Sequence, residues 1–134
     1  VSQQHIPVHP GVFVKILNYD RKTKSYKAPF QGTSYDLYLP SGRTPGKWTT
    51  IRNQPYPCRC GWHVWSSMFQ AASNTWPGTV VFLAEGRGGY VEKGGKIAFQ
   101  SIRLLRRVYV PRKNVSDVGR ELLILEAVGN YKRP

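Results

Sequence analysis

The segment Thr79-Val80-Val81-Phe82-Leu83-Ala84 carries the strongest strand signal in this chain of 134 residues. β-Branched and aromatic residues favour extended backbone. An uninterrupted apolar run is typical of a strand that is covered on both faces. We therefore predict that residues 79–84 form the central strand of a sheet.

Further strand signals lie on both sides of this segment. Val12–Leu17 is rich in β-branched and aromatic residues, and a long strand or bent pair is predicted for Ile97–Val110. The alternation slips at Leu104-Leu105, which predicts a β-bulge. The glycines between residues 86 and 95 predict a turn region. Shorter strands are expected at residues 26–30, 34–39, 47–51 and 62–65.

Two helices are predicted from capping residues and apolar spacing. Ser66 or Ser67 can cap a helix from Met68 to about Thr75, with Phe69, Ala72 and Trp76 on its buried face. Asn114 or Ser116 can cap a second helix that ends near Val128. The buried stripe expected for this second helix consists of Val118, Leu122 and Leu125. Because Gly119 weakens the helix, a strand over residues 122–125 is the alternative.

These elements predict an α+β domain with a mainly antiparallel β-sheet of six to eight short strands and one or two helices. A single domain fits the length of 134 residues, and 40% hydrophobic residues are enough for a packed core. We expect an N-terminal arm over residues 1–11, the globular domain over 12–129 and a basic C-terminal tail over 130–134. We expect neither a signal peptide nor a membrane span, since no apolar run approaches the roughly 20 residues that a span needs.

The chain is strongly basic, with 20 Lys and Arg against 7 Asp and Glu and a net charge of +13. A positive field of this strength attracts polyanions such as nucleic acids, nucleotides or acidic proteins. The alternative is a generic solubilising surface. The residues predicted to contact phosphates are Lys22, Lys24, Lys27, Arg103, Arg106, Arg107, Arg112 and Lys113.

Aromatic residues interleaved with cations are typical of grooves for single-stranded nucleic acid. Tyr35, Tyr38 and Trp48, near Arg43 and Lys47, form the predicted stacking set. Packing in the core is the alternative for these aromatic side chains.

Cys58, Cys60 and His63 lie within six residues and are the ligand types that zinc prefers. However, one residue separates the cysteines and the chain has no second pair, so we predict no metal site. A Cys–His nucleophile also lacks an obvious group to orient the imidazole. We therefore favour a packing role for the cysteines and leave the role of His63 open.

Several short motifs occur in one order between residues 12 and 110. They include Pro57-Cys58-x-x-Gly61-x-His63, Val81-Phe82-Leu83-Ala84-Glu85 and Lys96-Ile97-Ala98-Phe99. In this the chain resembles a group of small uncharacterised phage and actinobacterial proteins with a C-x-x-G-x-H core motif. The resemblance implies a bacteriophage setting, in the host cytoplasm or the virion, and brings no activity.

The segment Gly61–Ser66, followed by the predicted helix and strand, also resembles the ADP-ribosyltransferase fold. That resemblance implies an enzyme using NAD, in which His63 grips the nicotinamide ribose and Arg43 or Arg52 faces the phosphates. The chain departs from the family pattern because no E-x-E or Q-x-E pair follows, which leaves Glu85 and Glu92 as the central acidic candidates.

The sequence therefore supports three hypotheses. The first is a protein that binds nucleic acid or another polyanion without catalysis and without a cofactor. The second is a virion or assembly protein that docks on acidic subunits, and the third is the transferase. The sequence leaves open the identity of the partner, the choice among DNA, RNA and protein, and the oligomeric state.

Overall fold

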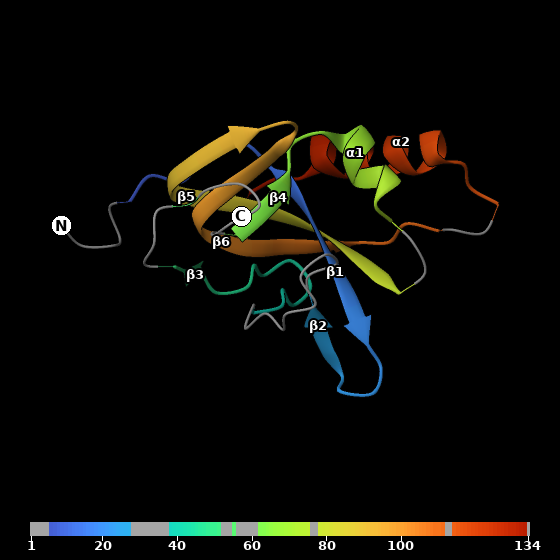
Figure 1. Ribbon diagram of the computed structural model, residues 1–134, viewed down its shortest axis with the longest axis horizontal. Coiled ribbons are helices and arrows are strands. Elements are labelled where there is room, and N and C mark those ends of the chain that lie inside the picture. Colours follow the sequence, from blue (N-terminus) through green and yellow to red (C-terminus); the bar gives the residue numbers. More distant parts are fainter. Residues whose placement is uncertain are drawn as a thin grey trace.

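The computed structural model describes residues 6–27, 38–51, 55, 62–75, 78–111 and 114–133 (Figure 1). In this part of the chain, six strands and two helices follow one another. They are β1 (Phe13–Asp20), β2 (Ser25–Lys27), β3 (Thr49–Thr50), β4 (Trp62–Trp65), α1 (Met68–Ser73), β5 (Thr79–Lys93), β6 (Lys96–Val108) and α2 (Asp117–Asn130). This confirms the predicted α+β class and its mainly antiparallel sheet.

Four strands close into a ring. β5 pairs with β1 on one side and with β6 on the other, and β4 pairs with both β1 and β6. All of these pairings are antiparallel. β2 extends β1 beyond the ring, and β3 pairs with β6 beyond β4. The segment 79–84 has a strand on each side, but it shares this with the other three strands of the ring, so the ring has no single central strand.

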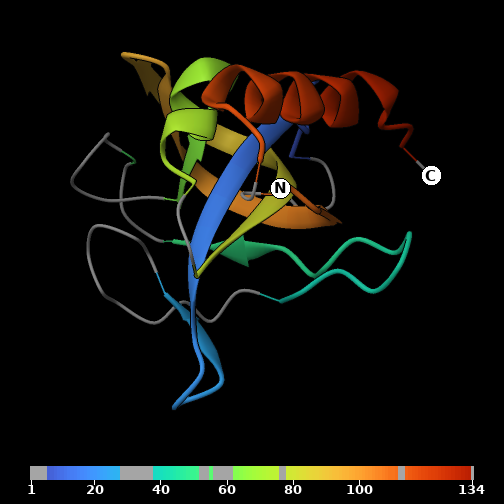
Figure 2. The same cartoon turned by 90° about the vertical axis from the view of Figure 1, so that its right-hand side faces the viewer.

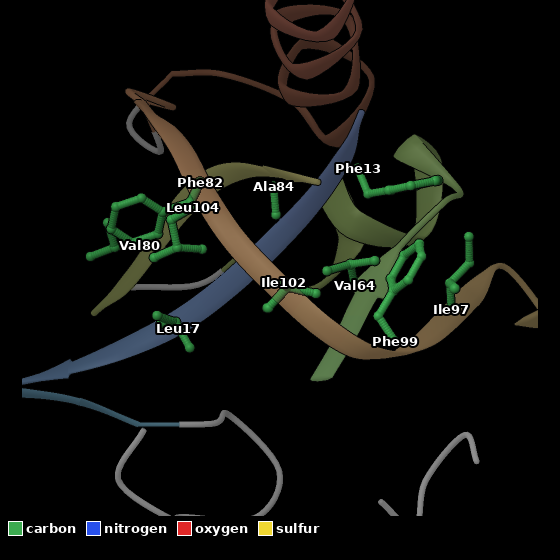
Figure 3. Close-up of a cluster of buried hydrophobic side chains, with 10 residues drawn as sticks. All are labelled: Phe13, Leu17, Val64, Val80, Phe82, Ala84, Ile97, Phe99, Ile102 and Leu104. Carbon is green, nitrogen blue, oxygen red and sulfur yellow. The ribbon is translucent and has the colours of Figure 1, made fainter. Parts of the chain in front are cut away.

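The interior of the ring is filled by side chains that alternate along the strands (Figure 3). Because successive residues of a strand point to opposite faces, every second side chain enters the ring. Burial of each large apolar side chain contributes roughly 1.5–3 kcal/mol. This cluster consists of Phe13, Leu17, Val64, Val80, Phe82, Ala84, Ile97, Phe99, Ile102 and Leu104.

The glycine-rich segment over residues 86–95 was predicted to be a turn region, and this prediction is wrong for all but its last two residues. β5 continues through it to Lys93, and the reversal lies at Gly94 and Gly95, whose φ angles are +60° and +82°. A Cβ atom at Gly86 would collide with the Phe99 ring. Gly86 therefore serves close packing within a strand, and a register shift between Arg87 and Tyr90 absorbs the irregularity.

The predicted bulge at Leu104-Leu105 is confirmed. Ala84 pairs with Leu104 while the preceding Leu83 pairs with Arg106, so Leu105 is the extra residue on β6. Without the bulge, Arg106 would point to the same face as Leu104, into the ring. The bulge therefore places Arg106 on the outer face.

The helices cover the outer face of the sheet and form a second apolar cluster with it (Figure 2). Ser67 Oγ accepts from the Gln70 amide at the start of α1, and Ser116 Oγ accepts from the Gly119 amide at the start of α2. The predicted serine caps are thus present. The buried members of this cluster are Val14, Ile16, Ala71, Ala72, Val81 and Ile124.

The predicted buried face is wrong for α2 and wrong in part for α1. In α2, Val118, Leu122 and Leu125 are 61%, 60% and 45% exposed, whereas Ile124 is fully buried. In α1, Phe69 is 60% exposed while Ala72 is buried as expected. α2 carries apolar residues on two sides, and periodicity alone does not show which side meets the sheet.

Other predicted boundaries also shift. Tyr38 and Leu39 lie outside the strands, so the strand expected over 34–39 is not seen in its described part. Residues 28–30 and 34–37 and Trp76 lie outside the described residues.

Candidate polyanion-binding surface

Three separate elements bring basic side chains to one depression. It has a volume of about 410 Å³ and lies where loop 38–48, the end of β6 and the end of α2 meet. Figure 2 shows that this loop and the C-terminal end of α2 project on the same side of the sheet. The lining residues are Arg43, Leu105, Arg106, Asn130, Tyr131 and Lys132, and we call this depression the basic groove.

Arg43 is held by a tight turn. The backbone groups of Ser41 and Thr44 exchange hydrogen bonds of 3.0 and 2.9 Å around it. Gly42, with φ +56°, provides the left-handed conformation that the turn requires. The Gly46 amide donates to the Leu104 carbonyl at 2.8 Å and ties the loop to β6. The turn thus presents Arg43 beside Arg106.

Cations and tyrosines lie close together next to the basic groove. The Arg107 guanidinium carbon lies 4.5 Å from the centroid of the Tyr109 ring, and Tyr109 is 75% exposed. A neighbouring depression of about 240 Å³ is lined by Arg106, Arg107, Tyr109 and Tyr131 among others. This surface therefore offers both charge and stacking partners.

Tyr131 lies at the end of α2 and shares both depressions. Burial, followed by the negative charge of Glu85, raises the pKa of its phenol. The phenol therefore stays neutral at physiological pH. A neutral phenol can stack on a flat ring and donate a hydrogen bond.

A buried carboxylate lies beneath this surface. Glu85 is 1% exposed, and its Oε1 accepts from Arg103 Nε at 2.5 Å while its Oε2 accepts from Arg133 Nε at 2.9 Å. Arg133 also donates to the carbonyl oxygens of His9, Pro10 and Gly11. Both oxygens of Glu85 are thus engaged, and Arg133 ties the C-terminal tail and the N-terminal arm to the sheet.

Trp48 contacts two arginines. The guanidinium carbons of Arg87 and Arg103 lie 4.3 and 4.8 Å from a ring centroid of Trp48. Burial, with the like charge of Arg103 as a second cause, lowers the pKa of Arg87. The Trp48 ring therefore makes cation–π contacts with two arginines. Tyr38, also predicted to stack, is 52% exposed and lies 5.4 Å from Lys47 Nζ.

The structure separates the cations that were predicted to act together. Arg106 and Arg107 are exposed next to the basic groove, whereas Arg103 is engaged by Glu85. Lys22 and Lys24 are exposed in the turn of the β1–β2 hairpin, which projects away from α2 (Figure 2). Tyr35, Arg112, Lys113 and the side chain of Lys27 lie outside the described residues.

The two residues proposed for the transferase lie in different places. His63 pairs with Ala98 on β6, and Glu85 pairs with Arg103, five residues further along the strand, or roughly 16 Å of extended chain. The depression beside Glu85 is lined by Val8, His9, Pro10, Arg103 and Arg133. Cys58, Cys60 and Arg52 lie outside the described residues.

Sequence reasoning missed several residues of this surface. Tyr109 and Tyr131 were not singled out as stacking residues, and Lys132 was not assigned to a site although the tail was recognised as basic. Arg43 was noted beside the predicted stacking set and as a phosphate ligand for the transferase, but it was not grouped with Arg106. The signal that could have found them is the concentration of cations and tyrosines at both ends of the final helix segment.

Within the described ranges, no group of three His, Cys, Asp or Glu side chains could hold a metal ion. Nor is any helix there long and apolar enough to cross a membrane. No family model, curated protein or solved structure matches the chain. The two family resemblances therefore stay predictions.

Proposed function

We propose that this protein binds nucleic acid without catalysis, and that the basic groove takes the phosphates of a single strand. The observation that carries the proposal is the convergence of Arg43, Arg106 and Lys132 from three elements on one depression with no acidic lining residue. Clustered cations in a depression whose described lining holds no carboxylate attract phosphate oxygens.

The aromatic neighbours favour a single strand over a duplex. Unpaired bases stack on exposed aromatic rings, and each such contact is worth about 1–3 kcal/mol by alanine substitution. Tyr109 and Tyr131 lie beside the groove cations. A duplex reader usually inserts a basic helix or ribbon into the major groove. α2 carries Asp117, Glu121 and Glu126 and is unsuited to that role.

Fluorescence anisotropy tests the proposal with labelled single-stranded DNA, single-stranded RNA and duplex DNA of equal length. We expect tighter binding of a single-stranded form, with an affinity that falls steeply as salt rises. Arg106→Glu combined with Arg107→Glu should abolish this binding.

The matched control is Lys22→Glu combined with Lys24→Glu. It makes the same change in net charge, but on the distant hairpin, and should cost far less affinity. Equal losses from the two double variants would assign binding to the overall charge and overturn the proposed groove. Absence of binding at low salt would overturn nucleic-acid binding altogether.

A further inference from the structure

α2 carries a second apolar stripe that the fold leaves uncovered. Val118, Leu122 and Leu125 are 61%, 60% and 45% exposed, and a Cβ atom at Gly129 would meet nothing within 4 Å. At 3.6 residues per turn these four positions fall within an arc of about 60°. Their spacing of four, three and four residues is the repeat that packs one helix against another.

This stripe is separate from the face that α2 packs on the sheet. Ile124 is fully buried and Val128 packs beside it. Their positions lie about 110° around the helix from the centre of the exposed stripe. Contiguous exposed apolar surface of this kind marks interaction sites in soluble proteins.

The charges beside the stripe are negative, which is unusual in this molecule. α2 holds Asp117, Glu121 and Glu126, three of the seven acidic residues in a chain of net charge +13. Glu121 and Glu126 lie on opposite sides of the stripe, each about 70° from its centre. Arg120 is engaged by Asp117 and by the Val115 carbonyl, so it does not offset these flanks.

We infer that this stripe docks an amphipathic helix of another protein, whose own apolar stripe is flanked by Lys or Arg. Opposite charges on the flanks of two packed helices select the partner. A second copy of this chain fits poorly, because parallel and antiparallel pairing of α2 with α2 both bring acidic flanks together. The stripe shares no residue with the basic groove, so this inference does not depend on nucleic-acid binding.

Two synthetic helical peptides of about 20 residues test the inference by anisotropy. They carry the same leucine stripe, but one has lysine flanks and the other glutamate flanks. We expect the lysine peptide to bind at least about tenfold tighter. The net charge of +13 attracts the glutamate peptide instead, so this preference can arise only from local acidic flanks.

Variants of α2 distinguish the contribution of the apolar stripe from that of its acidic flanks. Leu122→Gln with Leu125→Gln should abolish binding of the lysine peptide, and Glu121→Lys with Glu126→Lys should reverse the preference between peptides. Leu123→Gln is the matched control, because Leu123 is exposed on another side of the helix. Circular dichroism of each variant verifies that α2 still folds.

Three results would overturn the inference. One is that neither peptide binds, and another is that the glutamate peptide binds better to the unaltered protein. The third is a dimer of the chain itself, seen by light scattering at micromolar concentration and lost in Leu122→Gln, which would assign the stripe to a second copy.

Discussion

Arg133 donates its Nε–H to the buried carboxylate of Glu85 at a distance of 2.9 Å, although 48 residues separate them in sequence. Arg103 occupies the other carboxylate oxygen. The Arg133–Glu85 pair fixes the C-terminal tail. It thereby positions the neighbouring Lys132 and Tyr131 of the basic groove. The groove thus depends on an ion pair whose carboxylate is fully buried.

Replacement of Glu85 by Gln should destabilise the protein. The amide leaves two guanidinium groups without their counter-charge, and loss of one partner of a buried pair is costly. Because both arginines are partly exposed, we expect a loss of about 2 kcal/mol in the free energy of unfolding. Urea denaturation measures it, with Glu92→Gln on the exposed end of β5 as control. Equal stability of the two variants would contradict the structural role of Glu85.

Lys15 should make the stability of the fold depend on pH. Its side chain enters the ring, its Nζ donates to the His63 carbonyl at 2.7 Å, and burial lowers its pKa from 10.5 to about 7. The folded state therefore favours the neutral amine, while the unfolded chain keeps its proton up to about pH 10.5. Between these values the unfolded state binds more protons, so stability rises with pH by up to about 1.4 kcal/mol per unit.

Comparison of the unaltered protein with Lys15→Met isolates this effect from other titrations. We expect the stability of the unaltered protein relative to the variant to increase from pH 7 to pH 10 and to change little below pH 7. Denaturant titrations across this range measure the difference. A constant difference between the two proteins would show that Lys15 keeps its proton in the fold.

Gly86→Ala should weaken the core of the ring. The added methyl group collides with Phe99, a fully buried ring. Overpacking of this kind costs about 1–3 kcal/mol. Gly129→Ala is the control, because that position is helical and opens to solvent, so the same change should stabilise by about 0.5–1 kcal/mol. Thermal unfolding of both variants should therefore shift in opposite directions.

The fold was largely predictable from sequence because strand propensity and cap chemistry are local. The sequence predicts the strand over residues 79–84, a bulge at Leu104-Leu105 and a cap at Asn114 or Ser116. The continuation of β5 through Gly86 could not be predicted. A glycine that makes room for Phe99 looks the same in sequence as a glycine in a turn. The buried side of α2 was also missed, because two apolar stripes compete and tertiary packing selects between them.

The candidate site was less predictable because it combines residues that are distant in sequence. Arg106 belongs to the predicted basic cluster, but Arg43 and Lys132 join it through the ring and through the contacts of Gly46 and Arg133. The sequence prediction grouped Lys22 and Lys24 with Arg106, whereas the hairpin that carries these lysines projects away from α2. Charge counts predict the chemical class of a partner, whereas topology decides which charges share a surface.

Tyr109→Ala tests whether bases stack beside the basic groove. Because Tyr109 is 75% exposed, its truncation should leave the fold intact while it weakens binding of single-stranded nucleic acid by about 1–3 kcal/mol. The slope of log affinity against log salt should stay unchanged, since no phosphate contact is lost. Arg106→Ala should instead reduce the magnitude of that slope by about 0.7. Tyr109→Phe keeps the ring and should bind like the unaltered protein, so equal losses in the Ala and Phe variants would rule out stacking at this position.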